Sequence, residues 1–471
     1  MGWNDRLTPH GGLPHPWSTA AAQSLPGLGP QEPDALSSFA LAPRACSASG
    51  PALSRRIARL AGIAVLAALP LLGAVTDAGA TGVSVRGTDI LLDGKPFVPN
   101  GSSGQSRLGL LKGTGANVIR TYGEEPGEIL DAAQRAGLKV IVGFWMEHPR
   151  RGFDYANRAA VEAQLANLQK MVERYRTHPA LLMWGIGNEV ETELSPAQAE
   201  AVWPAIEQAA KLVKVLDPDH PVMSVVADTG GDKVAALKRA APSVDVLGIN
   251  AYGDSLLTII PRARAQGWTG PIVVTEMGAL GQWEAPKTPW GAPIEPTSTE
   301  KADRMQRYLT ALKAQKVGAL PFYWGQKQEV TPTWHSLFLP TGEYTETVQV
   351  MAQDFGGAMP DAANRAPRIF SLKLQGPASA EARTGISATL AATDPDGDPL
   401  KVEWQVMGET PVRGVGGDAE PVPATFKEAI HDASPTGVKV YGLEPGRYRL
   451  FVTVRDGRGA AATGNLPFEI R

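Results

Sequence analysis

The sequence of 471 residues has a single cysteine, Cys46, and no large excess of charge of either sign. One cysteine excludes an internal disulfide and a zinc site made of thiolates. A formal charge of -3, with 20% charged residues, gives no polyanion-binding surface, so nucleic acid is not an expected partner. His148 and His178 lack the spacing of metal ligands, and we expect neither a metal nor a cofactor. The hydrophobic content of 43% is that of a globular protein. The length of 471 residues is sufficient for two or three domains.

The N-terminal part of the chain has the pattern of an export signal behind an extension. Residues 1–53 are rich in Pro, Gly, Ser and Ala, which predicts disorder or a misassigned gene start. Arg55, Arg56 and Arg59 then precede the run LAGIAVLAALPLLGAV, and small residues follow up to Ala80. This predicts a signal peptide over residues 54–80, and its cleavage near Ala80 would also remove Cys46, which lies ahead of it. Since the run contains Pro70 and is short for a bilayer span of about 20 residues, we expect a periplasmic or secreted product without a stable membrane anchor.

After a lead-in hairpin predicted at residues 81–95, short apolar runs alternate with amphipathic stretches up to about residue 355. Eight runs are strand candidates: PFVPN, ANVIRTY, LKVIVGFWM, ALLMWGIGNE, PVMSVVAD, VDVLGINAY, PIVVTEMG and GALPFYW. Apolar residues repeat at steps of three and four between residues 157 and 176, and further helices are expected at 128–136, 196–216, 233–240 and 299–316. Strands of this kind separated by helices predict a parallel α/β sheet.

Eight such units predict a closed (β/α)8 TIM barrel over residues 96–355. An open doubly wound sheet is the alternative, but no Gly-rich phosphate turn follows the first strand.

A linker at residues 356–365, rich in Gly, Ala and Pro, separates the barrel from a segment of different composition. Runs such as RIFSLKLQ, GISATLAATD, KVEWQVM, GVKVYGL and RYRLFVTVRD alternate apolar and polar residues between turns. They predict a small all-β sandwich over residues 366–471, independent of the barrel and without a catalytic residue. TDPDGDPLKVEW resembles a turn and strand of bacterial Ig-like and cadherin-like modules. Asp394, Asp396 and Asp398 in it could bind Ca²⁺, although the spacing also suits a plain turn.

Polar residues directly after the apolar strands are the candidates for chemistry, because active sites of TIM barrels lie at the carboxyl ends of the strands. Glu189 follows MWGIGN and Glu276 follows IVVT. A carboxylate at the end of a buried strand is costly unless it has partners or faces a cleft. Two of them suit glycoside hydrolysis, in which one protonates the leaving oxygen and the other attacks the anomeric carbon or activates water.

HPALLMWGIGNEVE, followed two strand units later by IVVTEMG, resembles glycoside hydrolase clan A over residues 90–355. The motifs HPALLMWGIGNE and DPDHPV are similar to those of the family 2 catalytic barrel, and NVIRTYG resembles the corresponding segment of family 72 glucanosyltransferases. The resemblance implies a retaining mechanism with Glu189 as acid/base and Glu276 as nucleophile. Family 2 enzymes usually carry two β-domains before the barrel, where this chain has only a hairpin.

The same resemblance implies roles for residues around the two carboxylates. Asn188 would bind the sugar 2-hydroxyl, and Tyr252 would orient Glu276. Arg120 would favour the charged form of Glu276. Asn250 is a further binding candidate, with packing as its alternative. Trp145 and Trp324, which end two strands, are predicted to stack on sugar rings. Other tryptophans are assigned to the core or to loops that cover the barrel or extend the cleft: Trp203, Trp283, Trp290 and Trp334.

The sequence therefore predicts a retaining β-glycosidase that acts on an oligo- or polysaccharide, with a β-glucan as the first substrate hypothesis. A β-glucan transglycosylase with the same two carboxylates is one alternative. A non-catalytic carbohydrate-binding envelope protein is another, although the presence of both Glu189 and Glu276 argues against it. Glu147, Glu191, Glu193 and Glu329 are interpreted as loop residues outside the catalytic pair.

Overall fold

A computed structural model describes residues 82–471 with the exceptions of Glu124 and Val412. The predicted extension at 1–53 and the predicted signal peptide at 54–80 lie outside the described residues. Among the helices of residues 82–471, none is long and apolar enough to cross a bilayer.

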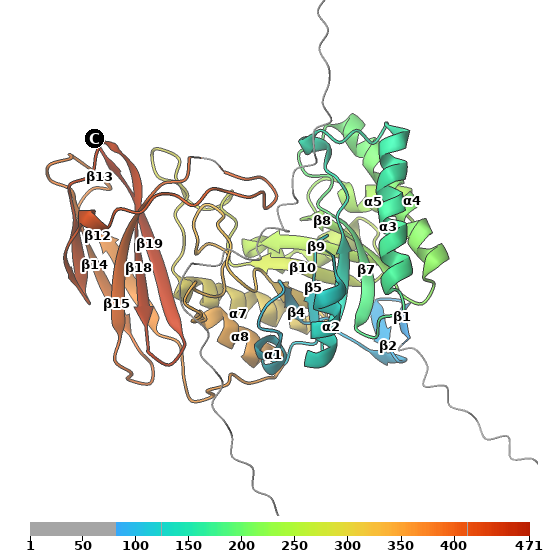
Figure 1. Ribbon diagram of the computed structural model, residues 1–471, viewed down its shortest axis with the longest axis horizontal. Coiled ribbons are helices and arrows are strands. Elements are labelled where there is room, and N and C mark those ends of the chain that lie inside the picture. Colours follow the sequence, from blue (N-terminus) through green and yellow to red (C-terminus); the bar gives the residue numbers. More distant parts are fainter. Residues whose placement is uncertain (1–81, 124, 412) are drawn as a thin grey trace, which may run out of the picture. The chain divides into compact units, whose positions relative to one another are not determined.

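Eight parallel strands form a nearly closed barrel, and they neighbour one another in chain order (Figure 1). The chain just after the last strand returns to the first strand, where the backbone N–H of Trp324 donates to the Ser103 carbonyl at 2.9 Å. This order, without the reversal of a doubly wound sheet, confirms the predicted barrel. The strands are β4 (Gly101–Ser103), β5 (Val118–Arg120), β6 (Lys139–Phe144), β7 (Leu181–Asn188), β8 (Val222–Ala227), β9 (Val246–Tyr252), β10 (Ile272–Gly278) and β11 (Gly318–Pro321).

Helices connect successive strands on the outside of the barrel, and the local sequence explains where several of them begin. The Asn157 side chain caps α3 by accepting from the Ala160 N–H at 3.2 Å, and Thr297 and Glu300 form a capping box at α7. The five predicted helices coincide with α2, α3, α4, α5 and α7. The helices are α1 (Leu108–Gly113), α2 (Gly127–Ala136), α3 (Arg158–Tyr175), α4 (Pro196–Leu216), α5 (Lys233–Ala240), α6 (Ile259–Ala265), α7 (Ser298–Ala314) and α8 (Glu346–Phe355).

The first barrel strand differs from its prediction. PFVPN was expected to form it, but the strand is the next segment, β4. Pro96 and Pro99 have no N–H for a ladder hydrogen bond, which disfavours a central strand over PFVPN. Part of that segment instead continues the lead-in sheet of β1 (Val83–Arg86), β2 (Asp89–Leu92) and β3 (Lys95–Pro96).

The barrel has an apolar layer inside the strands and another between strands and helices. Inside, side chains such as Leu182, Met223 and Val246 form a cluster that Val83 and Ile90 of the lead-in sheet join. Outside, the helices cover a larger cluster that includes Trp203, as expected for that tryptophan. The apolar interior leaves the carboxyl ends of the strands as the place for polar side chains.

The C-terminal segment is a β-sandwich of two four-stranded sheets. One sheet has the order β12-β14-β17-β16 and the other β13-β19-β18-β15. The sequence did not predict β19, where Gly464 and Pro467 interrupt the alternating pattern. The strands are β12 (Arg368–Leu374), β13 (Ser379–Ala380), β14 (Ile386–Thr393), β15 (Lys401–Gly408), β16 (Ile430–Ser434), β17 (Gly437–Val440), β18 (Gly446–Arg455) and β19 (Ala461–Ile470).

The sandwich and the barrel belong to one compact unit and share buried polar contacts. Arg449 of β18, which is 1% exposed, pairs with Glu409 at 2.7 Å and donates to the Pro293 carbonyl at 2.7 Å. The Asn465 side chain donates to Glu295 at 2.5 Å. The sandwich is thus less independent than the sequence suggested, because buried hydrogen bonds join it to the loop after β10.

Candidate active site

Glu276 lies in β10 at the mouth of the barrel and is held by three donors. Arg120, the last residue of β5, places Nη1 3.2 Å from Oε1 of Glu276. The Tyr122 hydroxyl donates to the same oxygen at 2.8 Å, and the Tyr252 hydroxyl donates to Oε2 at 2.9 Å. Donors and a neighbouring cation stabilise the charged form of a carboxyl group. The arrangement therefore suits Glu276 as a fixed carboxylate that is ready to attack.

The two tyrosines remain protonated donors. Burial, followed by the charge of Glu276, raises the pKa of Tyr122 and of Tyr252 well above the usual value for a phenol. Each hydroxyl therefore keeps its proton for Glu276 at any pH at which the protein would work.

Glu189 directly follows β7 and has a different environment. Its backbone is in the left-handed region, with φ of 50°, which residues other than glycine rarely adopt. The side chain receives a hydrogen bond from Asn250 Nδ2 at 2.7 Å. Burial, followed by the charge of Glu276, raises the pKa of Glu189 to about 8. A carboxyl group with this pKa carries a proton at neutral pH, as a general acid requires.

Asn188 and Asn250 connect the two carboxylates. Oδ1 of Asn188 accepts from Arg120 Nη2 at 2.7 Å and from Asn250 Nδ2 at 3.0 Å. Oδ1 of Asn250 accepts from the Thr275 hydroxyl at 2.8 Å. These bonds fix the orientation of both amides and link Arg120, Asn188 and Asn250, three of the polar strand-end residues that the sequence singled out beside Glu189 and Glu276. The fourth, Tyr252, joins them through Glu276.

Glu189 and Glu276 line the same cavity, whose volume is about 40 Å³. Its other walls come from strand ends, from the loops after β10 and β11, and from the sandwich. They are Asn188, Tyr252, Trp283, Phe322, Glu329, Gly416 and Gly417. The two glycines belong to the module that was expected to be independent of the site.

The two tryptophans predicted to stack on sugars are packed against protein. Trp145 is 5% exposed, and its ring stacks on His148 at 4.8 Å between centroids. Trp324 is fully buried, and its indole N–H donates to the Ser106 carbonyl at 2.9 Å. Neither lines the cavity, so their contact with a sugar stays a prediction. Trp283, which is 58% exposed, lines the cavity beside Tyr252 instead.

Glu329, interpreted from the sequence as a loop residue, is buried on the wall of the cavity. His335 lies 3.5 Å and Lys327 3.4 Å from its carboxylate, and Gln282 donates to it at 3.2 Å. Burial alone would raise the pKa of Glu329, but these neighbours, His335 foremost, lower it to about 2. The cavity wall thus carries an ionised carboxylate at Glu329.

Tyr122 is a site residue that sequence reasoning missed, although a signal for it exists. It lies two residues after Arg120, and residues i and i+2 of an extended segment point to the same side. Phe322, Gly416 and Gly417 carry no comparable signal, because their position depends on how the chain packs.

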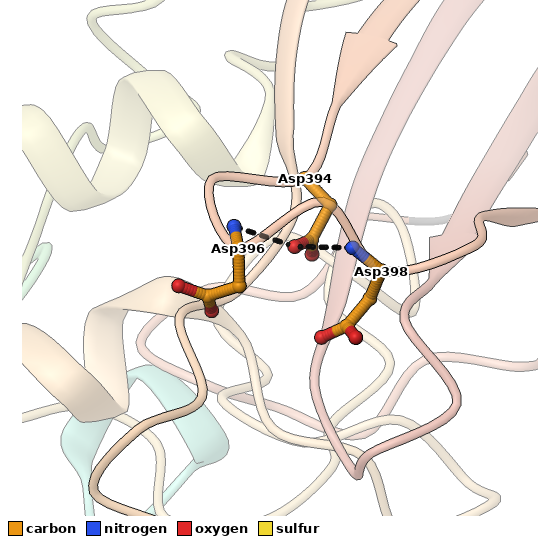
Figure 2. Close-up of side chains that lie close together, drawn as sticks. All are labelled: Asp394, Asp396 and Asp398. Carbon is orange, nitrogen blue, oxygen red and sulfur yellow. Dashed lines mark hydrogen bonds between the residues drawn. The ribbon is translucent and has the colours of Figure 1, made fainter.

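The Asp394, Asp396 and Asp398 cluster lies in the sandwich and forms a turn. Oδ1 of Asp394 accepts from the backbone N–H groups of Asp396 at 2.8 Å and Asp398 at 3.1 Å (Figure 2). Arg365 pairs with Asp396 at 2.7 Å, and Arg458 pairs with Asp398 at 3.0 Å. Two arginines balance the charge of the cluster, which favours the plain turn over the calcium site.

The barrel segment matches a known family. Residues 108–258 match the model described as the TIM barrel domain of glycosyl hydrolases family 2. A β-glucuronidase from Chlorocebus aethiops is 27% identical over 215 residues, which cover 40% of this chain and 31% of that protein. A β-glucuronidase from Paenibacillus borealis is 30% identical over 202 residues, which cover 36% of this chain and 31% of that protein.

The chain spans less than a third of the length of these curated relatives. Among solved structures, a β-D-glucuronidase from Dictyoglomus thermophilum has a TM-score of 0.48 and 20% identity, covering 58% of this chain and 53% of that one. The family match confirms, for residues 108–258, the resemblance to the family 2 glycoside hydrolase barrel that the sequence predicted.

Proposed function

We propose that the chain is a retaining β-glycosidase with Glu276 as nucleophile and Glu189 as acid/base. The observation that carries the proposal is the contrast between two carboxyl groups that line one cavity. Glu276 is surrounded by Arg120 and two tyrosine hydroxyls, whereas Glu189 receives one amide N–H and has a raised pKa. Paired carboxyl groups whose environments separate their protonation states divide the acid and nucleophile roles between them.

The reaction would proceed in two displacements at the anomeric carbon. First, Glu276 attacks that carbon and forms an ester, while Glu189 gives its proton to the glycosidic oxygen as the C–O bond to the leaving group breaks. The ester removes the negative charge of Glu276, one of the causes that keep Glu189 protonated. Glu189 then takes a proton from water, whose oxygen displaces Glu276 and restores both groups.

Asn188 would contribute to binding of the sugar. Because its Oδ1 already accepts from Arg120 and Asn250, its NH₂ group is the part of the amide that can donate to a sugar hydroxyl. Tyr122 would position Glu276, and Arg120 would position both Glu276 and Asn188. Asn250 would orient both Asn188 and Glu189.

The substrate class is a β-linked glycoside, with two candidates for the sugar. The ionised carboxylate of Glu329 on the cavity wall favours a neutral sugar such as glucose, because it can accept from hydroxyls and would repel a second carboxylate. The relatives are named β-glucuronidases, which favours a glucuronide as the second candidate. Lys327, close to Glu329, is a cation that could partly offset that repulsion.

Transglycosylation would use the same residues and differ only in whether a sugar or water accepts the glycosyl group. Separating the products formed at high donor concentration decides between the two reactions: longer oligosaccharides indicate transfer, and free sugar indicates hydrolysis. A non-catalytic carbohydrate-binding protein would give neither product.

We also propose that the protein is exported, since the arginines and the apolar run before Ala80 have the pattern of a signal peptide. N-terminal sequencing of the natural protein from culture medium or periplasm would give a start close to residue 81. A start upstream of the apolar run, in an intracellular fraction, would contradict this.

The mechanism is tested with a panel of 4-nitrophenyl β-glycosides, the glucoside and the glucuronide foremost. The active sugar is then offered as its 2-deoxy-2-fluoro glycosyl fluoride, which slows release of the covalent intermediate. We expect a mass increase of one fluorosugar, located on the peptide that contains Glu276, and no label on the Glu276→Gln variant. A label on another residue would contradict the assignment.

A further inference from the structure

A loop of the sandwich reaches the catalytic cavity. The connection between β15 and β16 contains residues 413–420, here called the pocket loop. Gly416 and Gly417 of this loop line the cavity together with Glu189 and Glu276. A module far along the chain therefore supplies part of the wall around the reacting groups.

The pocket loop approaches the candidate acid closely because it carries glycines there. A Cβ atom added to Gly416 would lie 3.1 Å from Arg150 Nη2 and 3.8 Å from Oε2 of Glu189. Gly416 and Gly417 also have φ of 56° and 79°, which favours glycine over other residues. The space beside Arg150 and Glu189 thus depends on Gly416, and the backbone conformation depends on both glycines.

Several polar contacts hold the pocket loop against the barrel. Asp418 accepts from Arg150 at 2.7 Å and also pairs with Arg151. Lys327 donates to the Gly417 carbonyl at 2.8 Å. Glu420 accepts from the Val330 N–H at 2.6 Å. The Asp418 side chain is 30% exposed, so solvent can compete for this pair when the loop moves.

The cavity under the loop is too small for a sugar. Its volume of about 40 Å³ compares with roughly 300–1,000 Å³ for pockets that bury small ligands. A whole sugar ring therefore does not fit beside Glu276, which is 6% exposed, unless part of the wall moves. Gly416 and Gly417 belong to the part of that wall that a partly exposed ion pair holds, whereas Asn188, Tyr252 and Phe322 are buried in the barrel.

We propose that the pocket loop is a movable wall that opens to admit the sugar and closes over it, with Asp418 bound to Arg150 and Arg151 as its clasp. This inference rests on the proposed function for the identity of what enters. It gives the C-terminal sandwich a part in substrate selection, because a substrate too large for the closed loop has to bind with the clasp broken.

The test compares Asp418→Asn with the full-length wild type on the 4-nitrophenyl β-glycoside that the panel selects and on a polysaccharide of the same sugar. We expect KM for the aryl glycoside to rise about fivefold with kcat changed less, since losing a partly exposed ion pair weakens the closed state by that factor. The ratio of polysaccharide to aryl-glycoside activity should rise. Asp418→Glu, which keeps the charge, should restore part of the wild-type KM.

Asp432→Asn is the matched control, since it removes an exposed aspartate of the same module that pairs with Lys439 at 2.8 Å. It should leave KM and the substrate ratio unchanged.

Trypsin provides a readout that needs no glycoside substrate, because Arg413, the first residue of the pocket loop, offers a cleavage site. Cleavage after Arg413 should be faster in Asp418→Asn than in the wild type or in Asp432→Asn. Unchanged cleavage and unchanged KM in Asp418→Asn would overturn the proposal. If the wild type turns over no β-glycoside, the proposed function fails, whereas faster cleavage in Asp418→Asn would still support the clasp.

Discussion

The two ends of the barrel are built from opposite kinds of side chain, although the same strands supply both. Inside the barrel, Leu182, Met223 and Val246 pack with Val83 of the lead-in sheet. At the carboxyl ends of the strands, buried polar residues are linked by hydrogen bonds around Glu276 and Glu189. The apolar interior therefore supplies stability, whereas the mouth holds the buried charged groups that the proposed chemistry needs.

The largest expected effect at the mouth comes from Glu276→Ala. Without the nucleophile no glycosyl-enzyme forms, so turnover of every substrate should fall by at least about 10⁴-fold. Initial rates on the 4-nitrophenyl glycoside measure it, and the circular dichroism spectrum verifies that the variant is folded. A variant with appreciable residual turnover would show that another group attacks the sugar.

Glu189→Ala should have a smaller effect that depends on the leaving group. General acid catalysis contributes typically about 10²–10⁴-fold, so natural glycosides should lose about this factor. Cleavage of the 4-nitrophenyl glycoside to the intermediate should lose less, because nitrophenolate departs with little need of a proton. Equal losses on both substrates would contradict the acid role.

At the apolar end of the barrel, Leu182→Ala should affect stability rather than catalysis. Removing this fully buried side chain should lower the free energy of unfolding by about 2–5 kcal/mol. Denaturant titration measures the loss, and kcat of the folded fraction at low temperature should stay close to the wild-type value. A large fall in kcat with unchanged stability would break the contrast between the two ends.

Tyr122→Phe tests how much one hydrogen bond to Glu276 contributes to activity at the mouth of the barrel. It removes one of the two hydroxyls that donate to Glu276 and leaves the ring in place. A hydrogen bond to a charged group contributes about 1.5–3 kcal/mol, so kcat/KM should fall about 10- to 100-fold. Tyr155→Phe is the matched control, because the Tyr155 hydroxyl donates to a backbone carbonyl outside the cavity.

The pH dependence should report the raised pKa of Glu189. The acid must be protonated to act, so kcat/KM should fall as the pH rises through about 8, by about tenfold per unit beyond it. In Glu189→Gln no proton titrates at this position, and the alkaline limb should disappear. An alkaline limb that persists in this variant would belong to another group.

The fold and the meeting of Glu189 and Glu276 at one cavity could be predicted because both depend on local pattern. Alternating apolar strands and amphipathic helices specify the barrel, and Glu189 and Glu276 stand out as carboxylates directly after apolar runs. Tyr122 was within reach of the same reasoning, since it follows Arg120 by two residues. The left-handed backbone of Glu189 was not, because it depends on the contacts that hold the end of β7.

The wall of the cavity could not be predicted, because it is made by contacts between distant parts of the chain. Asp418 meets Arg150 across 268 positions of sequence, and the length of an intervening segment does not indicate where its ends will pack. Glu329 is a similar case: its environment depends on His335 and Lys327 being folded against it. Sequence pattern specifies which strand ends meet, but the loops that cover them are placed by tertiary packing.

The most direct test of the two roles is the anomer formed with azide, which needs no base to react. In Glu189→Ala the intermediate on Glu276 still forms, so azide should restore turnover and yield the β-glycosyl azide by a second displacement. In Glu276→Ala azide should attack the substrate itself and give the α-glycosyl azide. Proton NMR of the products distinguishes the two. The same anomer from both variants, or the α-azide from Glu189→Ala, would contradict the assignment of Glu276 as nucleophile and Glu189 as acid/base.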